Sequence, residues 1–388
     1  MHRKRCGRKC LLLKKGTRIL LALMQLDIGG AETHVVELAK ELRRRGFEVF
    51  IASNGGAYEQ EVAEAGIKHY KVPLQNKNPF NVYSAYKTLE NIIKTEKIDL
   101  VHSHARIPSF ILGKLHKKMG FPFVTTAHWV FTTKYGLKYI TDWGEKTIAV
   151  SEDIKKYLKE NYKLPDKDIF VTINGIDTDK FSPTTSCSDV RREFGIGDND
   201  FCICAVSRMD ADRSLASKLL IKLAPRLSEM IPNLKLLIVG GGNDEAAAAE
   251  LAAEANKKCG EKRVILTGAR TDINKLVACS DLFVGVGRAA LEAMAAGKNT
   301  VIAGNEGFIG LFDESKLGIG IDTNFCCRGC VAATEELIYG DIAKYYSRSE
   351  EEKAAMSEYC RSTVMKYYSV AKMTDDCIRA YDSLDRIG

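Results

Sequence analysis

The chain has 388 residues, of which 45% are hydrophobic and 28% are charged. This composition is typical of a globular protein, and the length exceeds one ordinary hydrophobic core, so we expect two domains. The formal net charge is +7, but residues 1–18 hold eight lysines and arginines and no acidic residue. Taking these eight from the 57 basic residues leaves 49 against 50 acidic ones, a balance that argues against a nucleic-acid-binding protein.

Residues 1–16 are predicted to be a basic, disordered extension, because they show no amphipathic helical pattern. The alternative is peripheral contact with an anionic membrane surface, to which each basic residue contributes about 1 kcal/mol. The apolar run Cys10–Leu13 is too short for a signal peptide. No run approaches the roughly 20 apolar residues of a membrane span. We therefore expect a cytoplasmic protein, peripheral at the inner face of the membrane in the alternative case.

The 12 cysteines lack the paired spacing of a disulfide framework, and several lie in apolar runs, as Cys202 and Cys204 do. They indicate a reducing, cytosolic compartment. Cys327 and Cys330 form one CxxC pair, whereas a zinc site of that type needs a second pair, which the sequence lacks. No metal site is therefore predicted.

Apolar segments of strand length alternate with helical patterns through the first half of the chain. Strands are predicted at 18–24, 47–53, 99–103, 122–127, 146–150 and 169–173, and helices at 32–45, 79–95 and 106–119. Such alternation is typical of βαβ units around a parallel sheet. In the first helix, Val35, Leu38, Ala39 and Leu42 recur at helical spacing and are predicted to be buried.

Residues 177–189, rich in proline, serine, threonine and aspartate, are predicted to be a linker. The alternation then resumes, with strands at 201–207, 234–240, 263–267, 282–286 and 300–303 and helices at 214–229, 244–257, 271–279 and 288–297. The sequence therefore predicts an α/β protein with two doubly wound, Rossmann-like domains, 17–182 and 183–360, that face each other across a cleft. A C-terminal helix over 361–388 is expected to pack back towards the first domain.

Gly29 and Gly30 stand where the first strand ends and the first helix begins. Backbone N–H groups and the positive end of the helix dipole meet at such a corner and can bind an anion, whereas a plain tight turn also favours glycine. The segment alone leaves both interpretations open. Gly285 and Gly287 form a second corner of this kind, where Arg288 adds a positive charge.

Charged residues near the predicted strand ends suggest contacts to a ligand. Arg208 follows a strand, and Arg213 stands near the start of the next helix. Two such arginines can hold a diphosphate, although ordinary surface charge is the alternative. Glu292 lies about one turn into the helix after the second glycine corner. There its carboxylate can accept hydrogen bonds from ribose hydroxyls. The alternative is that it only interacts favourably with the positive end of the helix dipole.

Histidines end two of the predicted strands. His128 ends one of them, where a neutral imidazole can bind a sugar hydroxyl or a phosphate. His102 and His104 end another strand and are equally ambiguous, because a single histidine is more often structural. No histidine pair has metal-ligand spacing on a helix.

Six short motifs follow one another along the chain: Gly29-Gly30-Ala31-Glu32, Thr126-Ala127-His128, Ala149-Val150-Ser151, Asn174-Gly175-Ile176-Asp177 with Phe181 and Pro183, Ser207-Arg208-Met209 with Arg213, and Leu291-Glu292-Ala293-Met294-Ala295-Ala296-Gly297. Taken in order, they resemble the motifs of the family-four (group 1) glycosyltransferases. Each motif is weak alone, but their order over residues 17 to about 305 is specific.

The resemblance implies the GT-B fold and a hexosyltransferase that moves a sugar from a nucleotide-diphosphate donor, in the UDP or GDP form. The acceptor would be a glycan or a lipid-linked molecule in polysaccharide or cell-envelope biosynthesis. The first domain would serve the acceptor, and the second would bind the nucleotide sugar. The resemblance also implies retention of the anomeric configuration, no metal and no other cofactor.

The same resemblance assigns roles to residues. Arg208 and Arg213 would contact the diphosphate, and Glu292 would hold the ribose. His128 would contact the donor sugar, and Gly30 would face the donor phosphate and the acceptor. These two are the expected catalytic positions. The rest of the expected substrate-binding set is Gly29, Asn174, Gly285, Gly287 and Arg288.

One loop departs from the family. An earlier glutamate in an EGFGL segment has Val284 in its place, inside a predicted strand, and Glu306 in the segment GNEGFIG is the candidate substitute. This departure supports an alternative, a catalytically silent relative that binds a nucleotide sugar or a partner transferase. A nucleotide-sugar epimerase would need more carboxylates and histidines in the cleft. A dehydrogenase would need a GxGxxG segment after the first strand, which is absent from the sequence.

Overall fold

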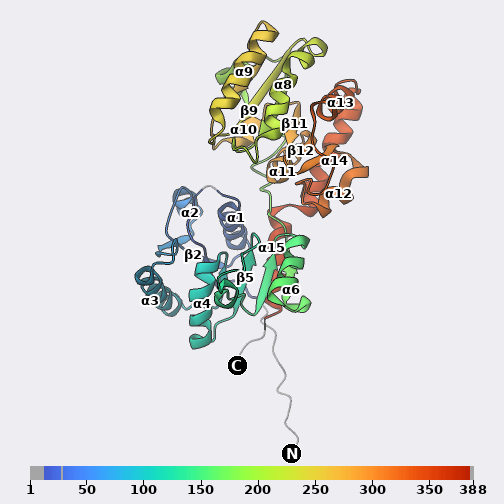
Figure 1. Ribbon diagram of the computed structural model, residues 1–388. Helices are drawn as coiled ribbons and strands as arrows, with labels where there is room; N and C mark the ends of the chain where they lie inside the picture. The colour runs from blue at the N-terminus through green and yellow to red at the C-terminus, as the bar shows by residue number, and fades with distance from the viewer. Residues whose placement is uncertain (1–12, 28, 385–388) are drawn as a thin grey trace, which may run out of the picture. The chain divides into compact units, whose positions relative to one another are not determined.

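The computed structural model describes residues 13–27 and 29–384, so the predicted extension lies mostly outside the described residues. The chain separates into two compact units (Figure 1). Unit 1 comprises residues 1–175 and 370–388, and unit 2 comprises residues 176–369. The chain leaves unit 1 after Gly175, before the predicted boundary at 182, and returns after Ser369, beyond the predicted boundary at 360.

Unit 1 contains a sheet of seven strands, all of them parallel. The strands are β1 (Arg18–Ala22), β2 (Glu48–Ser53), β3 (Lys68–Lys71), β4 (Leu100–Ser103), β5 (Phe123–Ala127), β6 (Lys146–Ala149) and β7 (Ile169–Val171). The helices are α1 (Gly30–Arg44), α2 (Glu59–Glu64), α3 (Pro79–Thr95), α4 (Arg106–Met119), α5 (Leu137–Ile140), α6 (Glu152–Tyr162), the 3₁₀ turn η1 (Asp166–Asp168) and α15 (Val370–Asp382). The order β3-β2-β1-β4-β5-β6-β7 reverses between β1 and β4, as in a doubly wound sheet.

Side chains of β1 alternate between the two faces of this sheet, as the strand period requires. Ile19 and Leu21 pack into a core with α1 and α15, whereas Leu20 and Ala22 pack into a second core with α3 and α4. The predicted face of the first helix is confirmed, because all four of its apolar residues are fully buried. Helix α15 therefore completes unit 1 with residues from the far end of the sequence.

Unit 2 contains a sheet of six strands in the order β10-β9-β8-β11-β12-β13. The strands are β8 (Phe201–Val206), β9 (Leu234–Val239), β10 (Val264–Leu266), β11 (Leu282–Gly285), β12 (Asn299–Gly304) and β13 (Gly307–Leu311). The helices are α7 (Ser188–Phe194), α8 (Leu215–Met230), α9 (Glu245–Cys259), α10 (Ile273–Ala278), α11 (Gly287–Ala295), the 3₁₀ turn η2 (Glu314–Lys316), α12 (Leu317–Asp322), α13 (Glu335–Tyr346) and α14 (Glu350–Tyr367). Helices α8, α9 and α13 cover one face of the sheet. The topological switch lies between β8 and β11.

Two edge strands were not predicted. Strand β3 has the sequence KHYK, whose charges are typical of edge strands but give no apolar signal. Strand β13 runs antiparallel to β12 and contains two glycines, so its sequence suggests a loop. Both lie at the margins of their sheets and leave the predicted doubly wound architecture unchanged.

None of the helices within residues 13–27 and 29–384 combines the length and the apolar character needed to cross a bilayer.

Candidate functional site

The corner at Gly29 and Gly30 connects β1 to α1. Gly29 has an extended backbone with φ −166°, so its conformation does not require glycine. A Cβ there would lie 2.3 Å from Oε2 of Glu32, whose carboxylate folds back over the start of the helix. Burial raises the pKa of Glu32. Gly30 is exposed, and a Cβ there would meet nothing within 4 Å, so a ligand has room to approach this corner.

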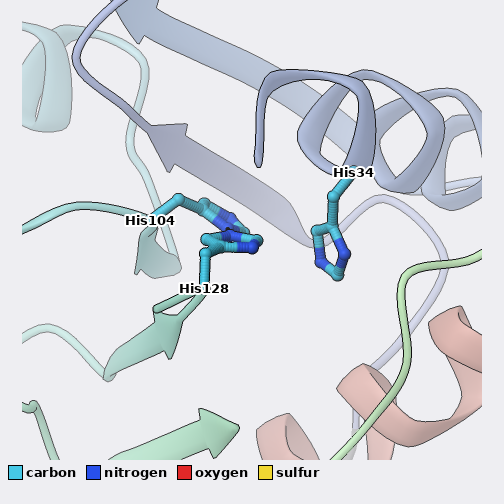
Figure 2. A group of neighbouring side chains, drawn as sticks. All are labelled: His34, His104 and His128. Carbon is cyan, nitrogen blue, oxygen red and sulfur yellow. The ribbon is translucent and has the colours of Figure 1, made fainter. Parts of the chain in front are cut away.

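Three histidines from separate segments of unit 1 meet in one cluster (Figure 2). His34 lies in α1, His104 directly follows β4, and His128 directly follows β5. Nδ1 of His104 and Nε2 of His128 are 3.1 Å apart, and Nδ1 of His34 is 3.1 Å from Oδ1 of Asn174. Two predicted site residues, His128 and Asn174, therefore belong to one polar group. The sequence gives no signal for His34 and leaves the role of His104 open.

His104 and His128 are held in their uncharged form. His34 and His104 are buried and His128 is half-buried. Burial, and then the neighbouring imidazoles, lower the pKa of His104 and His128 well below the ordinary histidine value. Neutral imidazoles can donate a hydrogen bond, accept one, or bind a metal ion.

His102 lies beside this cluster and has a structural role. Its Nδ1 is 2.8 Å from the hydroxyl of Tyr381, and its Nε2 is 2.7 Å from Oγ1 of Thr126. Its ring centroid is 4.0 Å from that of His104. With both ring nitrogens hydrogen-bonded, His102 supports His104 and has no nitrogen left for a ligand.

In unit 2, the loop between β8 and α8 holds the two predicted arginines. More than half of each side chain is exposed. Nε of Arg208 is 3.2 Å from Asp210, and Nε of Arg213 is 3.8 Å from Asp212. Exposed ion pairs of this kind contribute little stability, so a diphosphate can replace either carboxylate at small cost. Arg213 lies in this loop, before α8 begins.

A glycine-rich turn after β9 holds this loop in place. The Met209 N–H donates to the Gly241 carbonyl at 3.0 Å, and the Asp244 N–H donates to the Met209 carbonyl at 2.8 Å. A Cβ at Gly240, where φ is +142°, would lie 1.8 Å from the Ser207 carbonyl oxygen. The turn was not predicted as part of a site, although three consecutive glycines at a strand end are a visible signal of close backbone approach.

A cavity of about 340 Å³ lies beside this turn at the carboxyl ends of the strands. Its lining includes Met209, Ile238, Gly240, Glu245, Leu266 and Gly268, with alanines of α9. Oε1 of Glu245 accepts a hydrogen bond from the Gly242 N–H at 2.8 Å. The size and the mostly apolar lining suit a small planar ligand, with carbonyl groups at the edge to orient it.

The second glycine corner differs from its prediction. Gly285 ends β11, and a Cβ there would lie 2.8 Å from the ring of Phe283. Gly287 begins α11 with φ +58°, and its N–H donates to the Phe325 carbonyl at 2.7 Å. Both glycines are buried. Their small size thus serves packing within unit 2, and the Gly287 amide is already used by the chain itself.

Arg288 and Glu292 form an ion pair on α11, with Nε 2.8 Å from Oε1. Only 25% and 13% of the two side chains is exposed. Burial raises the pKa of Glu292, against the opposing effect of the Arg288 guanidinium. A carboxylate kept in a largely buried place at some electrostatic cost is a candidate ligand-binding group.

Glu306 occupies the tight turn between β12 and β13, where its carboxylate is 3.2 Å from Nε of Arg328. The adjacent Asn305 accepts a hydrogen bond from the Leu215 N–H at 3.1 Å, so this turn lies beside the arginine loop. Val284, which replaces the usual glutamate, is fully buried in β11. The carboxylate of Glu306, the predicted substitute, therefore lies at the same edge of the sheet as the arginine loop. It is carried by a β-hairpin and not by a loop before a helix.

Solved structures of similar architecture include glycosyltransferases. A glycosyltransferase from Rickettsia africae superposes with a TM-score of 0.75 at 24% identity, covering 95% of this chain and 98% of that one. HepE from Anabaena in complex with UDP gives a TM-score of 0.70 at 17% identity, covering 95% and 100% of the two chains. With its two doubly wound α/β units, the protein has the GT-B fold of glycosyltransferases.

Residues 28–180 match the domain described as Glycosyltransferase Family 4, and residues 188–355 match that described as Glycosyl transferases group 1. The chain belongs to this family of glycosyltransferases. A UDP-Gal:alpha-D-GlcNAc-diphosphoundecaprenol alpha-1,3-galactosyltransferase of Escherichia coli is 27% identical over 322 residues, covering 74% of this chain and 76% of that enzyme. An N-acetyl-alpha-D-glucosaminyl L-malate synthase of Bacillus anthracis is 25% identical over 293 residues, covering 70% and 74%. The resemblance seen in the six motifs is confirmed.

Proposed function

We propose that this protein transfers a sugar from a nucleotide-diphosphate donor, in the UDP form, to a glycan or lipid-linked acceptor, with retention of the anomeric configuration. The observation that carries the proposal is the set of groups at the carboxyl ends of β8, β9 and β11. Two exposed arginines, an apolar cavity and a largely buried glutamate are all found there. The UDP form is supported by the printed substrate of the Escherichia coli relative and by the UDP complex of HepE.

The chemistry of these groups suits a nucleotide diphosphate. The guanidinium groups of Arg208 and Arg213 would bind the diphosphate and stabilise the negative charge that develops on it as the sugar leaves. Glu292 would accept hydrogen bonds from the ribose hydroxyls, and the cavity beside Met209 would take the base. Gly30 and the neutral imidazole of His128 would serve the sugar and the acceptor in unit 1.

A second candidate function is a silent relative that binds the nucleotide sugar without turning it over. It is favoured by one observation, the buried Val284 in place of the family's earlier glutamate, with Glu306 paired to Arg328. An assay of donor hydrolysis and sugar transfer with UDP-, GDP- and ADP-sugars separates the two. Turnover of a UDP-sugar supports the enzyme, whereas nucleotide binding without turnover of any donor supports the silent relative.

Replacing Arg208 by alanine should weaken the binding of UDP by about 10-fold to 100-fold, because a charge-assisted hydrogen bond to phosphate is lost. The side chain is mostly exposed, so folding should be unaffected. Calorimetric titration with UDP measures the effect. The control is Arg226→Ala, which removes another partly exposed arginine of unit 2, one that pairs with Glu336 and lies over the ring of Tyr339. Equal UDP affinity in the two variants would show that Arg208 does not bind the diphosphate.

Chelator should leave the rate of sugar transfer unchanged, because arginines rather than a metal ion are proposed to neutralise the diphosphate. The assay compares initial rates after dialysis against EDTA with rates in added Mg²⁺. A complete loss of turnover in EDTA that Mg²⁺ restores would contradict this proposed mechanism.

A further inference from the structure

The cluster of His34, His104 and His128 presents three ring nitrogens to one another. One nitrogen from each ring lies within 4.8 Å of the other two. Figure 2 shows the three side chains converging from three different segments of the chain. The three histidines, from α1 and from the residues directly after β4 and β5, are adjacent because the sheet places β1 beside β4, and β4 beside β5.

The spacing of these nitrogens is close to that of a tetrahedral metal site. Two imidazole nitrogens bound to one zinc ion, each about 2.0–2.1 Å from it, are about 3.3 Å apart. The nitrogens of His104 and His128 that face each other are 3.1 Å apart. The ligand nitrogen of His34 lies up to 4.8 Å from the other two. A rotation of the His34 side chain that moves this nitrogen by roughly 1–2 Å would bring it to the spacing of a zinc site.

The hydrogen bonds around the rings are compatible with a metal-ligand role. Nε2 of buried His104 has no hydrogen-bond partner among the described residues, so the ring proton can reside there and leave the lone pair on Nδ1, which faces His128. Asn174 can accept the Nδ1 proton of His34, which places the lone pair of that ring on Nε2. Metal binding therefore needs only a shift of protons between ring nitrogens.

We propose that His34, His104 and His128 form a binding site for a divalent transition-metal ion such as Zn²⁺. Three imidazoles with no carboxylate suit zinc and copper, and they do not suit Mg²⁺, which prefers oxygen ligands. His128 is half-buried, so the fourth position is open to water or to an oxygen of a ligand. The inference is independent of the proposed transferase activity, because it concerns binding in the absence of any substrate.

The test is a calorimetric titration of the full chain with ZnCl₂, after removal of metals by chelator and dialysis. We expect one Zn²⁺ per chain at this site and no heat with MgCl₂. His128→Gln should weaken the zinc affinity by about 100-fold or more, since loss of a hydrogen-bond partner of a ligand alone costs 10-fold to 100-fold. The control His116→Gln, whose ring is bonded to the Phe121 carbonyl outside the cluster, should bind as the unchanged chain does.

A second titration with Co²⁺ identifies the ligands. A visible tetrahedral absorption band without a thiolate-to-cobalt charge-transfer band supports the imidazole site, whereas a charge-transfer band would assign the metal to cysteines. Asn174→Ala, which keeps all three histidines, should weaken binding by about 10-fold. Absence of zinc binding, or equal zinc affinity in the unchanged chain and in His128→Gln, would overturn the proposal. Normal thermal unfolding of the variants in the absence of metal separates lost binding from misfolding.

If the protein is the transferase proposed above, zinc at this site would inhibit it. Added zinc would occupy the ring nitrogen of His128 that the donor sugar needs, and chelator would then restore the rate of the metal-free protein. A protein that binds zinc but shows no turnover with any donor would refute the proposed function and leave the metal site standing. A protein that turns over UDP-sugars and binds no zinc would support the proposed function and refute the metal site.

Discussion

Glu292→Gln is expected to lower kcat/KM for sugar transfer by about 10-fold to 200-fold, while leaving the protein folded. The loss corresponds to about 1.5–3 kcal/mol, the usual value of hydrogen bonds to a charged group. Glutamine keeps the size of the side chain but accepts hydrogen bonds from ribose hydroxyls less strongly. The measurement is a comparison of initial rates with UDP-sugar concentration varied, together with UDP affinity.

The matched control is Glu254→Gln on α9. Glu254 forms an ion pair with Lys258, four residues later, at 2.8 Å. The distance and the spacing equal those of the Arg288–Glu292 pair, but the side chains of Glu254 and Lys258 are exposed. The control should change neither rate nor affinity. Rates that remain equal in Glu292→Gln and Glu254→Gln would show that the buried glutamate does not contact the donor.

Stability should respond to Glu292→Gln in the opposite direction from activity. Burial raises the folded-state pKa of Glu292 above its ordinary value of 4.5, so the folded protein holds this proton more tightly than the unfolded chain does. The contribution to stability is therefore present below pH 4.5 and is lost as pH rises through the raised pKa. At neutral pH the glutamine variant should unfold at the same or a higher temperature than the unchanged chain, and this difference should vanish at low pH.

The architecture was largely predictable from sequence because its core strands are apolar and its helices carry a regular buried face. Strand β8 and helix α1 are examples in which local pattern and burial agree. Strands β3 and β13 were missed because edge strands need little apolar surface. The exact points at which the chain changes unit, Gly175 and Ser369, were missed because no proline or glycine run marks them.

The candidate site could be proposed from sequence where one segment supplies the chemistry, and less so where the fold assembles it. Arg208, Arg288 and Glu292 each lie within a recognisable strand–loop–helix motif. His34 belongs to the histidine cluster only because β1, β4 and β5 are neighbours in the sheet, and this order is not written in the local sequence. The packing role of Gly287 likewise depends on Phe325, which is distant in sequence.

Tyr381→Ala is expected to destabilise unit 1 by about 3–5 kcal/mol, which is the usual cost of removing a buried aromatic ring. Tyr381 is fully buried in the core that α15 shares with α1 and β1. Its hydroxyl also bonds Nδ1 of His102 at 2.8 Å. The two units need not unfold together, so the measurement must report on unit 1 itself. We would monitor thermal unfolding by hydrogen exchange in peptides that contain β1 and β4.

Tyr381→Phe and Tyr139→Ala separate the sources of this effect. Tyr381→Phe keeps the ring and removes the hydroxyl, so it should cost about 1–3 kcal/mol by leaving a buried nitrogen of His102 without its hydrogen bond. Tyr139 is 88% exposed, and its replacement by alanine should change stability by about 0.5 kcal/mol or less. Because the ring of His102 packs 4.0 Å from that of His104, Tyr381→Phe should also weaken zinc binding, whereas Tyr139→Ala should not. Unchanged zinc affinity in a measurably destabilised Tyr381→Phe protein would mean that α15 supports the core of unit 1 without positioning the histidine cluster.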